Sequence, residues 1–429
     1  MTTFDLTLSD ISKIEGKCSL TVKVVDGKID DLKFAVTEYK RFYSQALRNK
    51  DIMGLPQLSC RICGTCSNAH LLCAIQAVED AMDIVPTEQT KTLRELLNYG
   101  LLIRDHALHL YVFVLPDMIG VDNILELDEE KDDERQILED TFGVKAAGNA
   151  LSIAIGGRSV HAPYPTVGGF SKIPNQQEFP ELVKKLQNIR PAVLRLIQRF
   201  VECTFTLERE VDFAALVDDQ LTFMKGQIVD SFGMCIPQNE FGEHLEHDVI
   251  PYSHASGYKY RGKTHMVGAI SRLNLAKDKL HPNTQKDVPE ALAKFPTKNI
   301  FQNNLAQAIE ILHSIDRSID ILNNLTIQQE QPIPVVRKAG IGVGVIEAPR
   351  GTLFYRLQID STGKTTGVQV VVPTGQNQIE MEQSLHKFIS NNLDKDKEYL
   401  TRESEKIIRA HDPCMSCASH FLELKLIKE

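Results

Sequence analysis

Apolar and polar residues alternate in two parts of the chain, one near each end. Residues 19–25 alternate, the pair Asp26-Gly27 is typical of a hairpin turn, and residues 29–36 alternate again. Residues 340–373 return to this pattern, with glycine and proline between the alternating stretches. The pattern therefore predicts two small β-rich parts.

Between these parts, apolar residues recur at three- and four-residue spacing, the period of an amphipathic helix. The clearest stripe contains Leu305, Leu312 and Ile319. Pro191 lies inside a helical pattern and is expected to kink that helix. No strand–helix–strand series is visible. The predicted helices cover residues 69–78, 90–115, 181–210 and 301–325.

The remaining internal segments are polar or rich in small residues. Residues 126–140 form an acidic stretch, residues 156–169 a glycine-rich loop, and residues 271–300 a polar region expected to be a surface excursion. The pattern as a whole predicts an α+β fold that is predominantly helical. Its expected form is a large helical bundle core with small peripheral β-sheets.

Composition and charge exclude several classes of protein. The chain has 48 Lys and Arg against 57 Asp and Glu, a net charge of −9, which argues against a nucleic-acid partner. No segment approaches the roughly 18–20 apolar residues that span a bilayer, so no direct membrane span is expected. The N-terminus shows no secretory signal pattern, which favours a cytoplasmic location.

Nine cysteines include two C-x-x-C pairs near opposite ends, Cys63/Cys66 and Cys414/Cys417. If the two pairs meet, four thiolates form a soft pocket suited to zinc, an iron–sulfur cluster, copper(I) or nickel. Structural zinc is the main alternative on spacing alone. However, zinc ribbons separate their pairs by roughly 15–20 residues, whereas most of this chain lies between them. A thioredoxin-like redox pair lacks its strand–helix–strand context.

Both cysteine motifs resemble those of nickel–iron hydrogenase large subunits. The segment RICGTCSNAH, residues 61–70, resembles the family signature R-I-C-G-x-C-x-x-x-H, and DPCMSCASH, residues 412–420, resembles the closing motif D-P-C-x-x-C-x-x-H. Further resemblances run along the whole chain. They are KIEG (13–16), DHALHLY (105–111), GGRSVH (156–161), EAPRGTL (347–353) and VPTGQN (372–377).

The resemblance implies a single domain over residues 1–429. Its expected parts, in chain order, are a β-rich N-terminal part (1–45), a helical core (46–340), a β-rich segment with the C-terminal metal motif (341–420) and a tail (421–429). A dedicated protease commonly removes such a tail in the family, so the tail is expected to be cleavable.

The resemblance also implies a nickel–iron centre that splits dihydrogen reversibly into protons and electrons. Cys63 and Cys414 would bind nickel terminally, while Cys66 and Cys417 would bridge nickel to iron. In the family, the iron carries carbonyl and cyanide ligands made by other proteins. Cys414 would accept the proton and Glu15 would carry it away, with a pKa raised toward neutrality by burial.

Other matched positions would surround this centre. Arg350 would lie over the open metal face, fixed by Asp105 and Asp412. Taken singly, both carboxylates are more often solvated or capping groups. The remaining matches are Pro349 and Ala348 as apolar lining, Thr374 as a hydrogen-bond donor to cyanide, and His70 as a partner of a bridging cysteine sulfur.

This sequence departs from the family pattern at several positions. Ser44 replaces a glutamate that, with His420, helps to hold a second, lighter metal of the magnesium type, so that site is short of one ligand. Lys17 and Tyr355 each stand where histidine is usual. Cys60 is an additional thiol with no assigned role.

Other histidines have less specific signals. His161 belongs to the loop that faces the electron-transfer partner in the family, and His106 and His109 are expected to be structural. His244 and His247 have i, i+3 spacing, but no third ligand is evident, so a solvated helix face is expected rather than a metal site.

The resemblance implies several protein partners. The cysteines outside the two pairs lack iron–sulfur cluster spacing, so electrons would leave through an iron–sulfur small subunit, with further electron-transfer subunits possible. A maturation protease and nickel-insertion proteins are also expected. Three other interpretations remain: a zinc-stapled structural protein, a dihydrogen-sensing regulatory subunit, and the quinone-site subunit of respiratory complex I, whose relatives lack the four metal cysteines.

Overall fold

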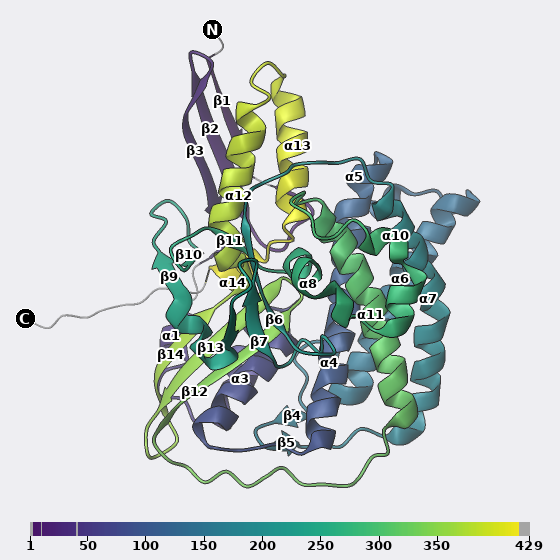
Figure 1. Ribbon diagram of the computed structural model, residues 1–429, viewed down its shortest axis with the longest axis vertical. Helices are drawn as coiled ribbons and strands as arrows, with labels where there is room; N and C mark the ends of the chain where they lie inside the picture. The colour runs from purple at the N-terminus through teal and green to yellow at the C-terminus, as the bar shows by residue number, and fades with distance from the viewer. Residues whose placement is uncertain (1–2, 10, 40–41, 420–429) are drawn as a thin grey trace, which may run out of the picture.

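An antiparallel sheet forms at the N-terminus, as the alternation predicts. The computed structural model describes residues 3–9, 11–39 and 42–419. Asp26 and Gly27 make the hairpin turn with φ of 51° and 73°, the left-handed conformation that suits two-residue hairpins. The strands are β1 (Phe4–Leu8), β2 (Cys18–Val25) and β3 (Lys28–Val36), with β2 in the centre. This sheet stands beside α12 (Pro373–Ser390) and α13 (Lys397–Ala410) in Figure 1.

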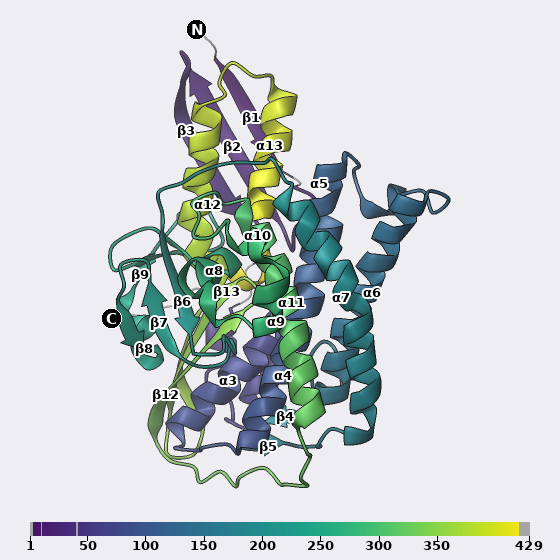
Figure 2. The ribbon, with the colours of Figure 1, turned by 45° about the vertical axis from the view of Figure 1, so that its right-hand side comes forward.

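Four long helices pack side by side into the helical part of the molecule (Figure 2). They are α4 (Glu88–Ala107), α6 (Asp132–Gly156), α7 (Phe179–Val201) and α11 (Gln302–Asn324). The hydroxyl oxygen of Thr87 caps α4 by accepting from the backbone N–H of Thr90. A π-helix, η1 (Leu108–Val114), and then α5 (Leu115–Ile119) continue α4, so the helix predicted over 90–115 is confirmed with a local change of pitch.

Helix α6 was not predicted, because its polar first half reads as an acidic stretch. Asp132, Asp133 and Glu134 occupy its first turn, where carboxylates favour the helix N-terminus. Gly157 ends the helix with a φ of 84°. In contrast, the helix predicted over 181–210 was too long, since α7 ends at Val201; Pro191 lies within it.

The C-terminal sheet packs on the helix that follows the first cysteine pair. It contains β12 (Gly340–Ala348), β13 (Gly351–Ile359) and β14 (Thr365–Val371), all antiparallel, and α3 (Ser67–Ala81) lies on β12 and β13. A Cβ at Gly342 or Gly344 would lie about 2.0 Å or 2.1 Å from a carbonyl oxygen of α3. These glycines therefore permit the close helix–sheet contact.

No strand was predicted for residues 212–266, which form several short strands. Strands β11 (His265–Met266), β6 (Asp212–Val217), β7 (Gln227–Asp230) and β8 (Cys235–Pro237) make one sheet, and β9 (Leu245–Asp248) pairs with β10 (Gly257–Tyr260). The other short elements are α1 (Tyr43–Ala46), α2 (Leu55–Ser59), η2 (Ile124–Glu126), β4 (Pro165–Thr166), β5 (Gly169–Phe170), η3 (Gln176–Glu178), η4 (Gln238–His244), η5 (Lys277–Lys279), α9 (Pro282–Asp287), α10 (Pro289–Leu292) and α14 (Met415–Ala418).

The surface excursion expected over 271–300 is wrong for its first part. Helix α8 (Ala269–Ala276) is mostly buried. Arg272 is fully buried and forms ion pairs with Glu310 at 2.6 Å and with Glu347 at 2.5 Å. Polar composition was misleading here because the charges neutralise one another inside the core.

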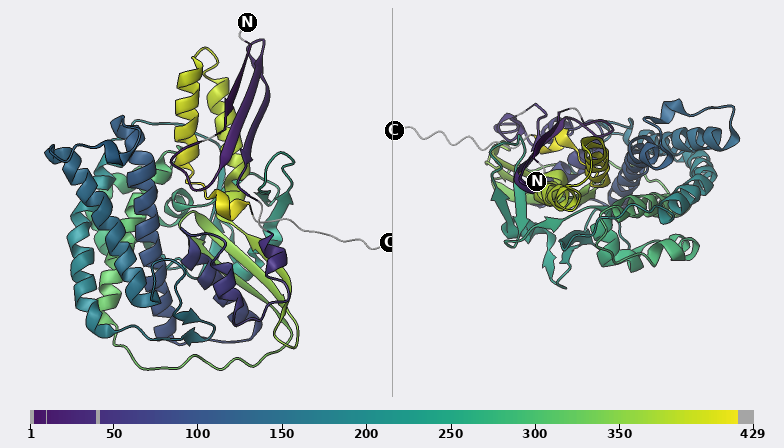
Figure 3. Two further views of the ribbon diagram at one scale, coloured as in Figure 1. Left: turned by 180° about the vertical axis from the view of Figure 1, so that it is seen from behind. Right: turned by 90° about the horizontal axis from the view of Figure 1, so that it is seen from above.

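The segment after β1 and the C-terminal cysteine motif meet below the N-terminal sheet (Figure 3). The segment after β1 pairs in parallel with the C-terminal motif through a bridge between Glu15 and Cys414, and the N–H of Met415 donates to the carbonyl of Glu15 at 2.9 Å. Figure 3 shows the C-terminal turn α14 in yellow at the foot of this sheet. The predominantly helical α+β fold is confirmed. Within the described part of the chain, no helix combines the length and apolarity needed to cross a bilayer.

Candidate metal centre

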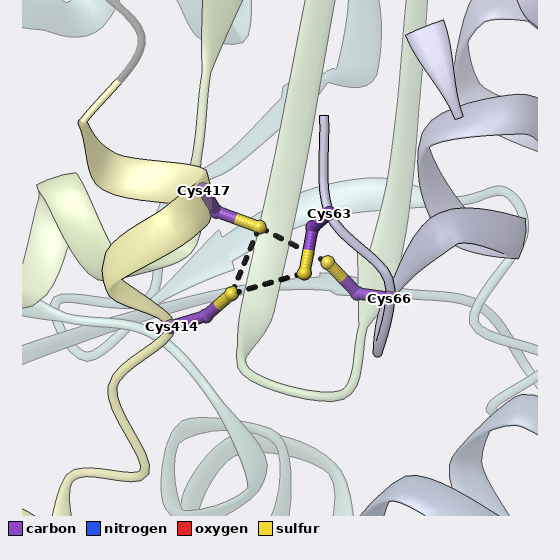
Figure 4. A group of neighbouring side chains, drawn as sticks. All are labelled: Cys63, Cys66, Cys414 and Cys417. Carbon is purple, nitrogen blue, oxygen red and sulfur yellow. Dashed lines mark hydrogen bonds between the residues drawn. The ribbon is translucent and has the colours of Figure 1, made fainter. Parts of the chain in front are cut away.

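Four cysteine sulfur atoms gather at one point in the interior (Figure 4). Sγ of Cys63 lies 3.2 Å from Sγ of Cys414, and Sγ of Cys66 lies 3.0 Å from Sγ of Cys417. All four sulfurs fall within 4.8 Å of one another, and all four residues are buried. The meeting of the two pairs across most of the chain is confirmed.

Two short loops present these sulfurs. Cys66 is the residue before the first turn of α3, and Cys414 is the residue before α14. The N–H of Cys414 donates to Oγ1 of Thr374, in the first turn of α12, at 2.9 Å. The second loop is therefore held both by α12 and by the backbone bridge to Glu15.

The charge on these thiols depends strongly on their neighbours. Hydrogen bonds from the surrounding thiols hold the pKa of Cys63 well below its ordinary value. Burial raises the pKa of Cys414 and of Cys417 well above theirs. Four adjacent thiolates require a cation among them, and soft sulfur donors suit nickel, zinc or iron. The donor set therefore fits the metal pair that the sequence motifs imply.

A buried guanidinium lies beside the sulfurs. Arg350 donates to Oδ2 of Asp105 at 2.6 Å and pairs with Oδ1 of Asp412 at 2.9 Å. Burial disfavours the charge, but the two carboxylates raise the pKa of Arg350 well above its ordinary value. Asp412 is fixed in turn by Gln307, whose Nε2 donates to Oδ2 at 2.8 Å. The arginine is therefore held from two sides.

A small cavity of about 10 Å³ adjoins the sulfurs. Arg350 and Thr374 contribute to its wall, and Ala348, Leu353 and Pro373 supply apolar surface. Pro349 does not line this cavity, and its carbonyl accepts a hydrogen bond from Arg272 at 3.1 Å. The lining residues are Cys66, His70, Ala348, Arg350, Leu353, Pro373, Thr374, Cys414 and Cys417.

Glu15 reaches the sulfur of the second pair. The Cys414 thiol donates to Oε2 of Glu15 at 3.1 Å, and the N–H of Ser416 donates to the same oxygen at 3.0 Å. Burial raises the pKa of Glu15, and the nearby charge of Cys63 raises it further. Glu15 as a whole residue is half-buried.

His70 bridges a cysteine and an aromatic residue. Its Nε2 lies 3.4 Å from Sγ of Cys417, and its Nδ1 lies 2.7 Å from the hydroxyl oxygen of Tyr355. Burial lowers the pKa of His70 to about 4. Tyr355 was noted in the sequence only as a departure from the family pattern, so its contact with His70 is a role that sequence reasoning missed.

The other histidines of the sequence motifs have hydrogen-bond partners other than the four sulfurs. His106 pairs with Glu310 at 3.0 Å, and Nε2 of His109 lies 2.8 Å from the carbonyl of Arg409, as structural residues would. The N–H of His161 donates to Oγ of Ser67, the residue after Cys66.

The helix face expected around His244 and His247 is wrong for His247, because η4 ends at His244. His247 lies on strand β9, with Nε2 2.6 Å from Oγ of Ser256. Among the described residues, the four cysteines are the group whose ligand atoms could share a metal ion. Ser44 is half-buried in α1. His420 and the tail, residues 421–429, lie outside the described residues.

Arg104 is a second cation near the sulfurs that sequence reasoning did not select. Its guanidinium donates to the carbonyl of Thr65, between Cys63 and Cys66, at 2.6 Å. Burial lowers the pKa of Arg104, while the charges of Asp105 and Cys66 oppose that change. Arg104 directly precedes Asp105 and its motif in the sequence. This adjacency could have indicated Arg104, because a charged residue in a buried segment is rarely left unpaired.

Comparisons with known proteins agree with this site. Residues 41–147 and 218–420 match the protein family described as nickel-dependent hydrogenase. The chain is 30% identical over 435 residues to the alpha chain of sulfhydrogenase 1 of Pyrococcus furiosus, a match that covers 98% of both chains. It is 29% identical over 459 residues to a chain of the F420-non-reducing hydrogenase of Methanothermobacter thermautotrophicus, over 98% of this chain and 96% of the relative.

A solved structure shares the fold. It is the crystal structure of an NAD+-reducing NiFe-hydrogenase in the H2-reduced state, with a TM-score of 0.87 at 22% identity, covering 98% of this chain and 100% of the other. The sequence matches, the shared fold and the four-cysteine cluster thus all indicate the same family. The chain belongs to the nickel-dependent hydrogenase family, whose activity is an oxidoreductase reaction on dihydrogen.

Proposed function

We propose that this chain is the catalytic subunit of a nickel–iron hydrogenase and that Cys63, Cys66, Cys414 and Cys417 hold the metal pair. The observation that carries the proposal is the approach of all four sulfurs to within 4.8 Å of one another. When bound, the metal pair supplies the site at which dihydrogen is cleaved heterolytically and the electrons are collected.

The protein supplies the route for the proton. Cys414 holds the proton on Sγ, and Glu15 accepts it at Oε2, which lies 3.1 Å away. The raised pKa of Glu15 suits this exchange, because a carboxyl group with an ordinary pKa would rarely be protonated near neutral pH. Its partial exposure opens the route toward the protein surface.

Arg350 supplies a fixed positive charge on the cavity wall. Asp105 and Asp412 hold its guanidinium, so little reorganisation is needed when charge develops beside it. Ala348, Leu353 and Pro373 keep the same cavity apolar, which favours a small nonpolar gas over water. Thr374 contributes a hydroxyl to this wall, and His70 contacts the sulfur of Cys417.

An iron–sulfur small subunit is the proposed electron acceptor. Both relatives described above are named as subunits of hydrogenases, which supports a partner chain for this protein as well. Apolar side chains are exposed close in sequence to the first cysteine pair, with exposed fractions of 56% for Phe42 and 43% for Leu58. We place the partner on this surface and on the loop of His161. We also propose a cytoplasmic location and tail removal by a maturation protease.

Metal analysis of the anaerobically purified protein with its partner tests the proposal. Nickel and iron in near equal amounts, infrared bands from metal-bound carbonyl and cyanide, and dihydrogen–deuterium exchange are the expected results. Zinc alone, without such bands, would overturn it in favour of a structural site. Metals and bands without turnover would indicate a dihydrogen sensor instead.

A further inference from the structure

The proposed metal ligand Cys417 determines which side chain donates in the hydrogen bond between His70 and Tyr355. Nε2 of His70 faces Sγ of Cys417 at 3.4 Å, while Nδ1 faces the Tyr355 hydroxyl at 2.7 Å. His70, Tyr355 and Cys417 are all buried, so water does not compete for these contacts. These contacts thus link Tyr355 on β13 through His70 on α3 to Cys417.

Cys417, as a metal ligand outside the proposed proton route, is a thiolate, and its sulfur can only accept a hydrogen bond. Nε2 of His70 must then carry the ring proton and donate to Cys417. A neutral imidazole has one N–H, so Nδ1 becomes an acceptor. The facing phenol satisfies Nδ1 only if the O–H of Tyr355 donates to it.

Ser59 permits the O–H of Tyr355 to donate to His70. The Ser59 side chain lies near the Tyr355 phenol, and it is fully buried at the end of α2. Its hydroxyl donates to the carbonyl of Leu55 at 3.0 Å and could donate to the phenol oxygen instead. Neither arrangement takes up the O–H of Tyr355, which is therefore able to donate to His70. Two proton arrangements are therefore open to these side chains: either Tyr355 donates to His70, or His70 donates to Tyr355. A thiolate at Cys417 is compatible only with the first.

We propose that Tyr355 is a positioning residue for the metal centre: its hydroxyl donates to His70 and thereby fixes the tautomer that donates to the sulfur of Cys417. The inference rests on the proposed function, since Cys417 must be a metal ligand. A hydrogen bond to a ligating sulfur withdraws electron density from it. The tyrosine thus adjusts the electron density of the metals without touching them.

The test is Tyr355→Phe, which keeps the ring and deletes the hydroxyl. Without the donor, His70 no longer holds one tautomer, the sulfur donates more strongly to the metals, and the carbonyl and cyanide infrared bands should move to lower wavenumber. The matched control is Tyr111→Phe, which deletes another buried hydroxyl, one that donates to the carbonyl of Ala192 at 3.3 Å. Its bands should stay at the wild-type positions.

A double-mutant cycle separates an effect through His70 from a general change in packing. In a His70→Gln background, Tyr355→Phe should cause no further band shift, because the residue through which it acts is gone. An equal shift in both backgrounds would overturn the inference. So would unmoved bands in Tyr355→Phe protein that contains wild-type amounts of nickel.

Should Tyr355→Phe fail to load nickel, Tyr355→His is measured in its place. Its ring N–H can still donate toward His70, so the bands should stay closer to the wild-type positions than those of His70→Gln. Bands displaced as far as in His70→Gln would contradict the role of the donor. Absence of nickel and of bands in the wild-type protein would refute the proposed function itself, which is a separate outcome.

Discussion

Glu15 and Cys414 are hydrogen-bonded although 399 positions of the chain separate them. Oε2 of Glu15 accepts from Sγ at 3.1 Å, and the two backbones form a parallel bridge at the same residues. The contact between side chains is therefore supported by a contact between main chains. In the proposed function, a proton leaving the sulfur therefore meets an acceptor that is held by contacts of both side chain and main chain.

Replacing Glu15 with glutamine should slow dihydrogen turnover by on the order of 10²-fold, because an amide keeps the shape but cannot take the proton. Nickel content should not change, since Glu15 binds no metal in the proposal. Glu95→Gln is the matched control: it removes another partly buried carboxyl group, whose pKa burial raises to about 7. Wild-type turnover in Glu15→Gln would exclude Glu15 from the proton route.

Arg350→Lys should lower turnover by on the order of 10²-fold while the protein stays folded, because one ammonium cannot bridge Asp105 and Asp412 as the guanidinium does. Arg190→Lys makes the same change at an arginine that also bridges two aspartates, at 2.8 Å and 2.7 Å, away from the sulfurs. Equal turnover in the two variants would show that the position of Arg350 has no special importance. Both are compared by hydrogen uptake per nickel.

Cys417→Ser should abolish dihydrogen–deuterium exchange and leave the polypeptide mostly folded, because a hydroxyl is a much poorer ligand for soft metals. Cys73→Ser provides the control, since a serine there can still donate to the carbonyl of Gly344, as the thiol does at 3.2 Å. Exchange and circular dichroism are measured on both variants. Wild-type exchange in Cys417→Ser would contradict a bridging role for this cysteine.

Arg272→Met should destabilise the protein by about 3–5 kcal/mol, because it leaves the fully buried carboxylates of Glu310 and Glu347 without their cation. Thermal unfolding of the complex reports the loss. Arg402→Met removes an exposed arginine paired with Glu403 at 3.5 Å, and its effect should stay within about 0.5 kcal/mol. Similar melting temperatures for the two variants would contradict the importance of the buried network.

Acidic pH should destabilise the fold through two buried histidines. Burial lowers the pKa of His265 and of His313 from 6.5 to about 4. Between these values the unfolded chain binds a proton at each site and the folded chain does not. Stability should therefore fall as the pH drops from 6.5 toward 4, by up to roughly 3 kcal/mol for each histidine.

Melting temperatures from pH 7.5 to pH 5.5 measure this dependence. His265→Gln should flatten it, because glutamine does not titrate. His386→Gln, at an exposed histidine, should leave the slope unchanged. Identical slopes in wild type and His265→Gln would show that another group controls the acid instability.

Regular amphipathic elements could be predicted from the sequence, whereas several others could not. The stripe from Leu305 to Ile319 predicted α11, because one apolar face is visible in the spacing. Helix α6 was missed because an acidic first turn looks like a loop when its buried face is unknown. Arg272 looked exposed because its partner carboxylates, Glu310 and Glu347, lie far away in the sequence.

The candidate site likewise contains residues that the sequence identified and residues that only the structure revealed. Motif spacing selected the four cysteines, and the resemblance to the family selected Glu15 and Arg350. Tyr355 and Arg104 needed the fold, since their relation to the sulfurs passes through His70 and through the carbonyl of Thr65. The contacts themselves cannot be read from the sequence, because the two partners of each are far apart along the chain.

The sequence by itself determined the donor groups of this protein: two thiol pairs, a carboxylate and a strongly basic side chain, placed in recognisable motifs. Only the tertiary structure decided that the thiols lie within 4.8 Å of one another and which buried groups hold each charge. The physical reason is that donor type is a property of each residue. Desolvation and hydrogen-bond direction arise only when distant segments exclude water together.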